Sequence, residues 1–502
     1  MRRLWITGAA LALVGTVALV ALHPRRTAGS PTERSTARPT TVQQVSVSIP
    51  VSDGVRLAGY LSTPTRGTGR PLLIMPGAWG AGSDQYRSIS DRAVSLGYDV
   101  VAYTQRGFGG SGGLIDMAGS RTQVDVSDVI SWALPRTGAD SSRVGALGLS
   151  YGGGIALLAA ARDSRIRAVV AMSTWADLAD VFAPRGTVKS SDLALLLANR
   201  AVAPELRTLQ ANVGNLSTAR AALTGLSPSR SPSSVVAELN RNGTAIFIAN
   251  AYEDSLFQPS DVVSFFNTLT GPKRLLLGSG DHVAPLTPAY ASSSWWTMAF
   301  SWLDSYAGRS GSVSGAPVQL TDATTGRTHA YGSWPPAKDS VQLSLAASRT
   351  EPVTVGLASV ADSGTQQLNT AHNYVLPQVR VASVDTRAAT LWSASSEHAA
   401  RSVCGTPSVQ FTVHSSAAVT LYIYLYDVDA GGTGQLMTTA PYTVKAGVQS
   451  VGVPLEPICW TIPAGHHVSA IVDTFDNRYV GTTPPAATVT LSPTAQLTVP
   501  DG

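Results

Sequence analysis

Residues 144–161 read VGALGLSYGGGIALLAAA. An aliphatic run, Val144 to Leu149, leads into Ser150, and a segment of glycine, alanine and leucine follows. A buried strand, a tight turn and a small-residue helix that lies close to a sheet would give this order. The segment therefore predicts an α/β sheet in which Ser150 is exposed on a strand-to-helix turn.

Two segments of the chain fit the pattern G-x-S-x-G. The segment Gly148–Gly152 has Ser150 at its centre, and the segment Gly109–Gly113 has Ser111 at its centre. Only the first follows a buried run and leads into a helix, so Ser150 is the predicted nucleophile and Ser111 the accidental match. The motif alone leaves a purely structural glycine turn open.

The surrounding chain, from about residue 45 to 307, alternates short aliphatic runs with helical segments. This alternation predicts a mainly parallel sheet with helices on both faces. The predicted strands cover residues 55–62, 71–76, 98–104, 143–149, 166–173, 244–250 and 273–279. The predicted helices include residues 84–96, 121–134, 152–162 and 293–306.

Two segments depart from that alternation. Residues 176–240 carry helical patterning where a short connection would suffice, which predicts a helical cap. After residue 310 short alternating runs are separated by turn residues, which predicts an all-β jelly roll or sandwich. We therefore expect a catalytic domain at 43–309, a β domain at 310–502 and a linker at 308–317.

A serine nucleophile needs a base, and the positions of the histidines in the chain indicate which residue is that base. Of eight histidines, His282 is the only one between residues 24 and 328, and it follows the predicted strand at 273–279. That position is the edge where a parallel sheet presents its functional loops. His282 is therefore the predicted base.

The base in turn needs an orienting carboxylate, which in α/β-hydrolases lies between serine and histidine in the chain. Asp254 follows the strand at 244–250 and is the predicted acid. Glu253 is its neighbouring competitor, and Asp281 is another, although its adjacency to His282 suggests that it points elsewhere.

Stabilising an oxyanion needs fixed donors. The backbone N–H of Tyr151, directly after the nucleophile, is one predicted donor. The second would come from the loop after the strand at 71–76, through the amide of Ala78 or Trp79 or the indole of Trp79.

The N-terminal residues indicate export. Met1-Arg2-Arg3 precedes an uncharged apolar run, so residues 1–42 are predicted to be a signal peptide or retained signal anchor followed by a disordered tether. This segment holds six arginines against one glutamate, whereas the formal net charge is +4. The rest is nearly neutral, which disfavours a nucleic-acid partner.

The chain has two cysteines, Cys404 and Cys459. In an extracytoplasmic protein a disulfide is favoured over two buried thiols.

With these residues identified, the chain resembles the X-prolyl dipeptidyl peptidase and cocaine-esterase-like family of serine hydrolases. The resemblance is carried by G-x-S-Y-x-G at Gly148–Gly153, by QRGFGGSGG at 105–113 and by two C-terminal segments, residues 421–439 and 455–479. Trp79 stands where cocaine esterases have an oxyanion-donating tyrosine. The resemblance implies an α/β-hydrolase with a cap and a C-terminal jelly roll.

The expected function is hydrolysis of an acyl ester or peptide amide through an acyl-serine intermediate, with no cofactor and no metal. The first alternative is an X-Pro dipeptidyl peptidase proper. The second is a catalytically silent surface protein whose jelly roll binds a glycan or polymer. A membrane would be contacted only through the N-terminal anchor, and the sequence does not indicate an oligomeric state.

Overall fold

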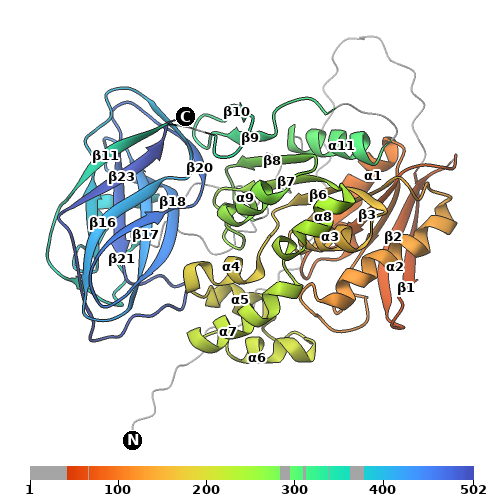
Figure 1. Ribbon diagram of the computed structural model, residues 1–502, viewed down its shortest axis with the longest axis horizontal. Helices are drawn as coiled ribbons and strands as arrows, with labels where there is room; N and C mark the ends of the chain where they lie inside the picture. The colour runs from red at the N-terminus through yellow and green to blue at the C-terminus, as the bar shows by residue number, and fades with distance from the viewer. Residues whose placement is uncertain are drawn as a thin grey trace, which may run out of the picture. The chain divides into compact units, whose positions relative to one another are not determined.

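Aliphatic strands buried on both faces build the sheet that carries the predicted site. The computed structural model describes residues 42–65, 67–282, 294–308, 313–336, 339–361 and 378–501. Within these residues ten strands form one sheet in the order β1-β2-β4-β3-β5-β6-β7-β8-β9-β10 (Figure 1). The strands from β4 to β9 in this order pair in parallel. Their bounds are β1 Val42–Pro50, β2 Arg56–Pro64, β3 Leu72–Pro76, β4 Asp99–Tyr103, β5 Val144–Leu149, β6 Ile166–Met172, β7 Ala245–Ala251, β8 Lys273–Gly278, β9 Val318–Thr321 and β10 Thr328–Tyr331.

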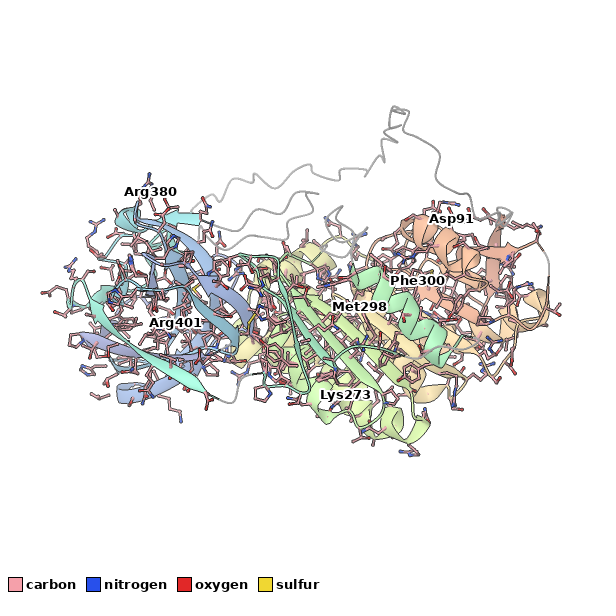
Figure 2. All side chains as sticks on the ribbon, turned by 90° about the horizontal axis from the view of Figure 1, so that it is seen from above. Asp91, Lys273, Met298, Phe300, Arg380 and Arg401 are labelled. Atoms are coloured by element: carbon pink, nitrogen blue, oxygen red, sulfur yellow. A yellow bond between two sulfur atoms is a disulfide. The ribbon has the colours of Figure 1, made fainter. Side chains whose placement is uncertain are left out.

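Helices cover both faces of this sheet. Alternate residues of β5 belong to different cores, because Ala146 packs with α2 and α3 whereas Leu147 packs with α1 and α11. The helix α11 also carries Met298 and Phe300 (Figure 2). Burial on both faces explains why the strands are continuously apolar. The helix bounds are α1 Arg87–Ser95, α2 Ser120–Thr137, α3 Tyr151–Arg162, α8 Val236–Asn242, α9 Pro259–Thr268 and α11 Ser294–Tyr306.

A helical insertion separates β6 from β7, where the sequence predicts a cap. Its helices extend the core on one face of the sheet, with Leu193, Leu206 and Leu223 fully buried. The α-helices are α4 Leu178–Phe182, α5 Ser190–Leu197, α6 Arg207–Ala211 and α7 Leu216–Leu226. The 3₁₀ turns are Pro184–Gly186, Pro204–Leu206, Ser227–Ser229 and Pro232–Val235, and one further turn, Ser83–Tyr86, precedes α1.

The C-terminal region is built of antiparallel strands with alternating burial. The described residues form an eleven-stranded sheet and a separate pair, β15-β20. In β16 the alternation places Val409, Phe411 and Val413 in the β-domain core. The strand bounds are β11 Ser340–Ala347, β12 Val353–Thr354, β13 Gln378–Arg380, β14 Ala389–Ser393, β15 Arg401–Gly405, β16 Ser408–Ser415, β17 Val419–Val428, β18 Thr433–Val444, β19 Gly447–Pro454, β20 Ile458–Ile462, β21 His467–Asp473, β22 Thr488–Leu491 and β23 Thr494–Pro500; one 3₁₀ turn covers Val381–Ser383.

The α/β sheet extends past the domain boundary predicted at 309/310. The strands β9 and β10 lie beyond the predicted linker, yet β9 pairs in parallel with β8 and β10 closes a hairpin against β9. Val318 and Leu320 are fully buried in this position. The short alternating pattern of β9 and β10 is typical of the β domain, so the sequence did not reveal that these two strands complete the α/β sheet.

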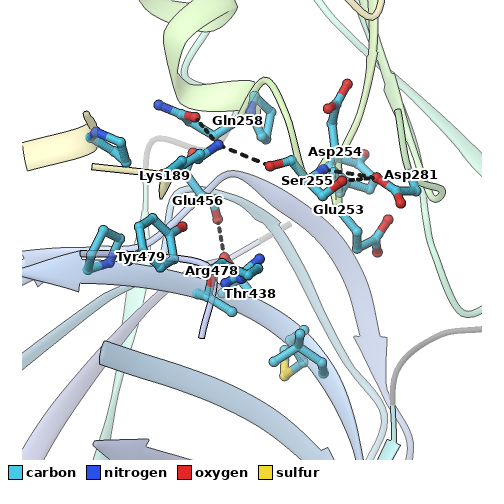
Figure 3. A pocket seen from close by; sticks show the side chains of 17 residues that line it. Lys189, Glu253, Asp254, Ser255, Gln258, Asp281, Thr438, Glu456, Arg478 and Tyr479 are labelled. Atoms are coloured by element: carbon cyan, nitrogen blue, oxygen red, sulfur yellow. Dashed lines mark hydrogen bonds between the residues drawn. The ribbon is translucent and has the colours of Figure 1, made fainter. Parts of the chain in front are cut away.

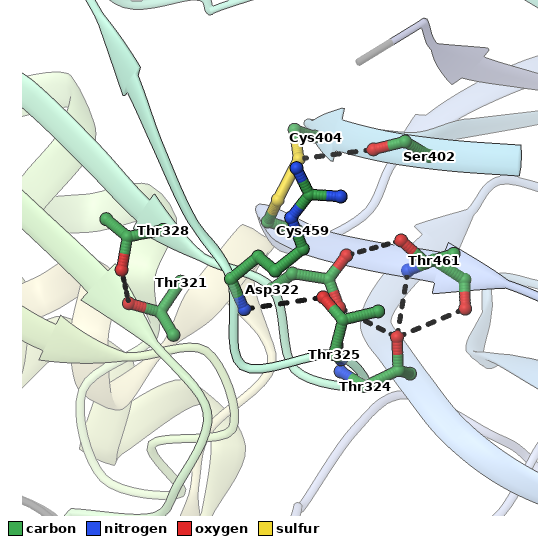
Figure 4. Close-up of a disulfide and its surroundings, with 10 residues drawn as sticks. Thr321, Asp322, Thr324, Thr325, Thr328, Ser402, Cys404, Cys459 and Thr461 are labelled. Atoms are coloured by element: carbon green, nitrogen blue, oxygen red, sulfur yellow. Dashed lines mark hydrogen bonds between the residues drawn. A yellow bond between two sulfur atoms is a disulfide. The ribbon is translucent and has the colours of Figure 1, made fainter.

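The predicted disulfide is present. Cys404 on β15 and Cys459 on β20 are paired directly across the two strands and are fully buried (Figure 4). The strand β20 also holds the turn that follows β9, because the Ala323 amide donates to the Cys459 carbonyl at 2.9 Å and the Thr461 hydroxyl to Asp322 at 2.6 Å. The disulfide thus stabilises the strand pair on which the end of the α/β sheet is anchored.

The predicted signal segment and tether, residues 1–42, lie outside the described residues except for Val42, which begins β1. In the part of the chain that is described, no helix is long and apolar enough to cross a bilayer. Residues 40–502 form one compact unit.

Candidate active site

Ser150 occupies the turn between β5 and α3, as predicted. Its backbone has φ 54° and ψ −122°, a conformation that is rare for a residue with a side chain. The turn is fixed from both sides, because the Ser150 amide donates to Met172 O at 2.8 Å and the Ser150 carbonyl accepts from Gly153 N at 2.9 Å. The surrounding strand and helix therefore hold the serine in this strained conformation.

Two glycines make this turn sterically feasible. A Cβ on Gly148 would lie 2.1 Å from the backbone of Gly152, and a Cβ on Gly152 would lie 2.1 Å from Pro76 O. Both contacts are with backbone atoms, which cannot rotate away. The small residues of the motif are thus required by the close approach of α3 to β5 and β3.

The structure brings Ser150, His282 and Asp254 together. His282 Nε2 lies 2.6 Å from Ser150 Oγ, and His282 Nδ1 lies 2.9 and 3.0 Å from the two carboxylate oxygens of Asp254. An ionised carboxylate accepts hydrogen bonds and does not donate, so this contact places the proton on Nδ1. The lone pair of Nε2 then faces the serine hydroxyl.

The Asp254 carboxylate is itself held by the turn that follows it. Its Oδ1 accepts from the amides of Leu256 at 3.0 Å and Phe257 at 2.8 Å. The Asp254 side chain is 0% exposed, and the His282 side chain is 6% exposed. A buried carboxylate with fixed donors keeps one orientation, which in turn fixes the imidazole.

The two rival carboxylates have other partners. Glu253 Oε2 accepts from the Gly280 amide at 2.7 Å. Asp281 Oδ1 accepts from the Ser255 amide at 2.9 Å, from the Ser255 hydroxyl at 2.8 Å and from the His282 amide at 2.7 Å. Asp281 therefore joins the loop that carries the acid to the loop that carries the base.

The rival serine has a structural role. Ser111 Oγ donates to Thr104 O at 2.7 Å and accepts from the Ala58 amide at 2.9 Å. These bonds close the glycine-rich turn against β2 and β4.

The predicted oxyanion residues lie at the start of α3 and after β3. Tyr151 is the first residue of α3, a helix of 12 residues whose N-terminus favours negative charge. The Trp79 indole donates to Leu196 O at 3.1 Å and is therefore engaged with the cap. Of the donors that the sequence left open, the amides of Ala78 and Trp79 remain the candidates.

A series of aromatic rings connects the oxyanion loop to the imidazole. Trp79 contacts Tyr151 edge-on with a centroid distance of 5.0 Å, and Tyr151 stacks on Trp175 at 6.0 Å. Trp175 meets Phe257 at 5.7 Å, and Phe257 meets the His282 ring edge-on at 4.9 Å. This aromatic arc ends on the His282 ring, where the apolar edge contact with Phe257 lowers the local polarity and so strengthens electrostatic interactions.

The electrostatics of the site raise the pKa of His282. Burial alone would lower the pKa of His282, but the charge and hydrogen bond of Asp254, with Asp281 and Asp192 at longer range, raise it above 6.5. Burial raises the pKa of Glu253 to about 8, so this carboxyl is largely neutral at pH 7.

The raised histidine pKa predicts how activity depends on pH. Only neutral imidazole accepts the serine proton, so kcat/KM is expected to rise with pH through an apparent pKa above 6.5. Initial rates of ester hydrolysis at subsaturating substrate, from acid to alkaline pH, measure this value. The acid limb of the pH profile is the range over which kcat/KM rises with pH. An acid limb with an apparent pKa below the ordinary histidine value would contradict this prediction.

One cluster among the described residues has the geometry of a metal site. The potential ligand atoms of His329, Cys404 and Cys459 lie within 4.8 Å of one another. The two sulfurs are joined in the disulfide and are not thiolate ligands.

The comparisons with known proteins concern the family and the fold of the chain. Residues 53–284 match the sequence model of the X-Pro dipeptidyl-peptidase family, S15. The predicted resemblance is confirmed. The matched segment begins before β2, ends directly after His282 and includes all three triad positions.

Two solved structures share the fold over both domains. An aminopeptidase from a marine sediment Thaumarchaeota archaeon superposes with a TM-score of 0.73 and 15% identity, covering 94% of this chain and 98% of its own. An α-amino acid ester hydrolase also gives 0.73, with 14% identity over 94% of this chain and 98% of its own. These likenesses confirm the predicted fold class.

A relative in sequence covers a smaller part. The quorum-quenching protein AidA of Acinetobacter baumannii is 31% identical over 132 residues, which is 25% of this chain and 42% of that protein. The family match supports a serine hydrolase of the acyl-esterase or peptidase type, and the structural neighbours show the fold.

Sequence reasoning missed the residues that support the triad. Asp281 appeared only as a rival acid, and Lys189 of the cap was not singled out. Lys189 is followed by the polar residues Ser190, Ser191 and Asp192, so its burial was not predictable from the local sequence.

Proposed function

We propose that this protein is an exported serine hydrolase that cleaves acyl esters or peptide amides through an acyl-serine intermediate. The observation that carries the proposal is the 2.6 Å contact between Ser150 Oγ and His282 Nε2, with Asp254 on the other imidazole nitrogen. A hydroxyl is a weak nucleophile unless such a base accepts its proton.

In this mechanism Ser150 Oγ attacks the substrate carbonyl while His282 Nε2 takes the hydroxyl proton. Asp254 holds the Nδ1–H tautomer and stabilises the imidazolium. The oxyanion receives hydrogen bonds from the Tyr151 amide and from an amide of the Ala78–Trp79 loop. His282 then protonates the leaving group, and a water activated by the same imidazole releases the acyl group.

The surroundings favour an uncharged acyl group over a peptide with a free amino terminus. A free amine needs a carboxylate partner, but the carboxylates beside Trp175 are already engaged. Asp261 accepts from the amides of Ala176 at 2.6 Å and Asp177 at 2.9 Å, and Asp177 accepts from Ala179 N at 2.9 Å. Within the aromatic arc, Tyr151, Trp175 and Phe257 are buried, and the partly buried Trp79 offers apolar surface beside the oxyanion loop.

Export is part of the proposal. The basic start of the chain and its uncharged run support it, and a disulfide is compatible with an oxidising compartment. Antibody detection of the full-length chain in extracytoplasmic fractions of the producing cell would test it.

Covalent labelling tests the proposed chemistry. A fluorophosphonate is expected to modify the wild-type protein at Ser150, identified by peptide mass spectrometry, and to leave Ser150→Ala unmodified. The reason is that the reagent phosphonylates only a serine that a base activates. Equal labelling of Ser150→Ala would contradict the assignment.

The same preparation distinguishes the substrate classes. Short-chain and aryl acyl esters are expected to turn over with higher kcat/KM than X-Pro amides. The reverse order would favour the X-Pro dipeptidyl peptidase alternative. Absence of labelling and of turnover, together with retained glycan binding, would favour the silent binding protein.

A further inference from the structure

A lysine from the cap reaches the loop that carries Asp254. Lys189 directly precedes α5 and is 3% exposed. Its Nζ lies 3.1 Å from Ser255 O and 2.9 Å from Gln258 Oε1 (Figure 3), and it also lies 2.9 Å from Leu256 O. Three acceptors match the three donors of an ammonium group, whereas a neutral amine has only two. The contacts therefore specify a charged lysine inside the protein.

The carbonyls that Lys189 binds belong to the peptide units that hold the acid. The Ser255 carbonyl and the Leu256 amide form one planar unit, and the Leu256 carbonyl and the Phe257 amide form the next. The two amides donate to Asp254 Oδ1. Each unit thus accepts from the ammonium at one end and donates to the carboxylate at the other, and such chains polarise and strengthen each other.

The backbone of Lys189 is fixed independently of its side chain. The Lys189 amide donates to Phe182 O at 2.8 Å, and Val188 pairs with Val480 of the β domain in both directions, at 3.1 and 2.8 Å. Ser191 Oγ donates to Arg478 O at 3.1 Å. The ammonium therefore projects from a rigid segment onto the acid loop, so its removal changes the loop and not the cap.

We propose that Lys189 is a positioning residue for the catalytic acid. Through the two peptide units after Ser255 it fixes the Asp254 carboxylate against His282, and its charge favours the neutral imidazole that takes the serine proton. The proposal deepens the proposed function and depends on it.

The charged groups around this pair set the sign of the effect. Burial lowers the pKa of Lys189; Asp192 raises it, Arg478 lowers it, and Asp254 and Glu456 raise it. His282 faces Asp254, Asp281 and Asp192, whose negative charges raise its pKa. The positive charge of Lys189 partly compensates the negative charges of these carboxylates. Removing it therefore raises the pKa of His282.

The test compares Lys189→Met with Lys273→Met. Lys273, labelled in Figure 2, is a matched control because its Nζ also donates to two backbone carbonyls at the end of α9, Phe266 O at 2.9 Å and Leu269 O at 2.7 Å. Fluorophosphonate labelling rates, kcat and KM for an ester, the pH profile of kcat/KM and the thermal unfolding temperature are measured for both.

Lys189→Met is expected to lower kcat/KM by up to about 100-fold, mainly through kcat, because small misplacements of catalytic groups have effects of this size. Its acid limb moves to higher pH, whereas Lys273→Met keeps the wild-type kinetics and profile. Lys189→Gln, which retains a donor without the charge, shows the same pH shift and serves if Lys189→Met does not fold.

Three outcomes would overturn the proposal: wild-type kinetics in folded Lys189→Met, a lowered rate with an unmoved acid limb in both Lys189 variants, or an equal loss in Lys273→Met. Failure of the proposed function looks different, because the wild-type protein would then not react with the fluorophosphonate at all.

Discussion

Ser150→Ala and His282→Ala are each expected to lower kcat by roughly 10⁶-fold, and the double variant by no more than either single one. The members of a serine triad act as a unit, so removing either the nucleophile or its base abolishes the same step. The 2.6 Å contact between Ser150 Oγ and His282 Nε2 is the physical basis for this coupling. Initial rates of ester hydrolysis by the three variants measure it.

Ser111→Ala is the control for Ser150→Ala. This variant removes a hydroxyl from the other G-x-S-x-G segment, where Ser111 Oγ donates a hydrogen bond to Thr104 O and accepts one from the Ala58 amide. This variant is expected to keep wild-type kcat and to lose stability by about 1 kcal/mol for the missing hydrogen bonds. Additive losses in the double variant, or a loss of activity in Ser111→Ala equal to that of Ser150→Ala, would contradict the assignment of the nucleophile.

The strand-turn-helix segment was predictable because local sequence specifies it. The apolar run of β5, the flanking glycines and the small residues of α3 all meet steric demands that lie within a few positions of Ser150. His282 and Asp254 followed from their places after predicted strands, since the carboxyl ends of parallel strands meet at one edge of the sheet.

The remaining features depend on contacts between distant segments, which composition and periodicity do not report. The strands β9 and β10 complete the α/β sheet although their alternation is that of the β domain. The Trp79 indole is directed to Leu196 O by the packing of the cap, so its unavailability as an oxyanion donor was not predictable. Lys189 and Ser255 meet across 66 positions of the chain for the same reason.

Asp254→Asn is expected to lower kcat by roughly 10⁴-fold while the protein stays folded. The side chain of asparagine has one acceptor oxygen. This oxygen would take the place of Oδ1 and accept the hydrogen bonds from the amides of Leu256 and Phe257, which lie 3.0 and 2.8 Å from Oδ1. The side-chain NH₂ would then face His282 Nδ1 and force the proton onto Nε2. An imidazole in that tautomer donates to Ser150 Oγ and cannot take its proton.

The neighbouring carboxyl supplies the control. Burial raises the pKa of Glu253 to about 8, so the group is largely protonated at pH 7 and Glu253→Gln changes little at the triad. We expect Glu253→Gln to keep wild-type kcat/KM. The residual activity of Asp254→Asn should also have its acid limb at lower pH, because the carboxylate that raises the pKa of His282 is gone. The test is to measure kcat/KM of both variants across pH. A large loss of kcat/KM in Glu253→Gln, together with near-normal kcat/KM in Asp254→Asn, would show that Glu253 is the catalytic acid.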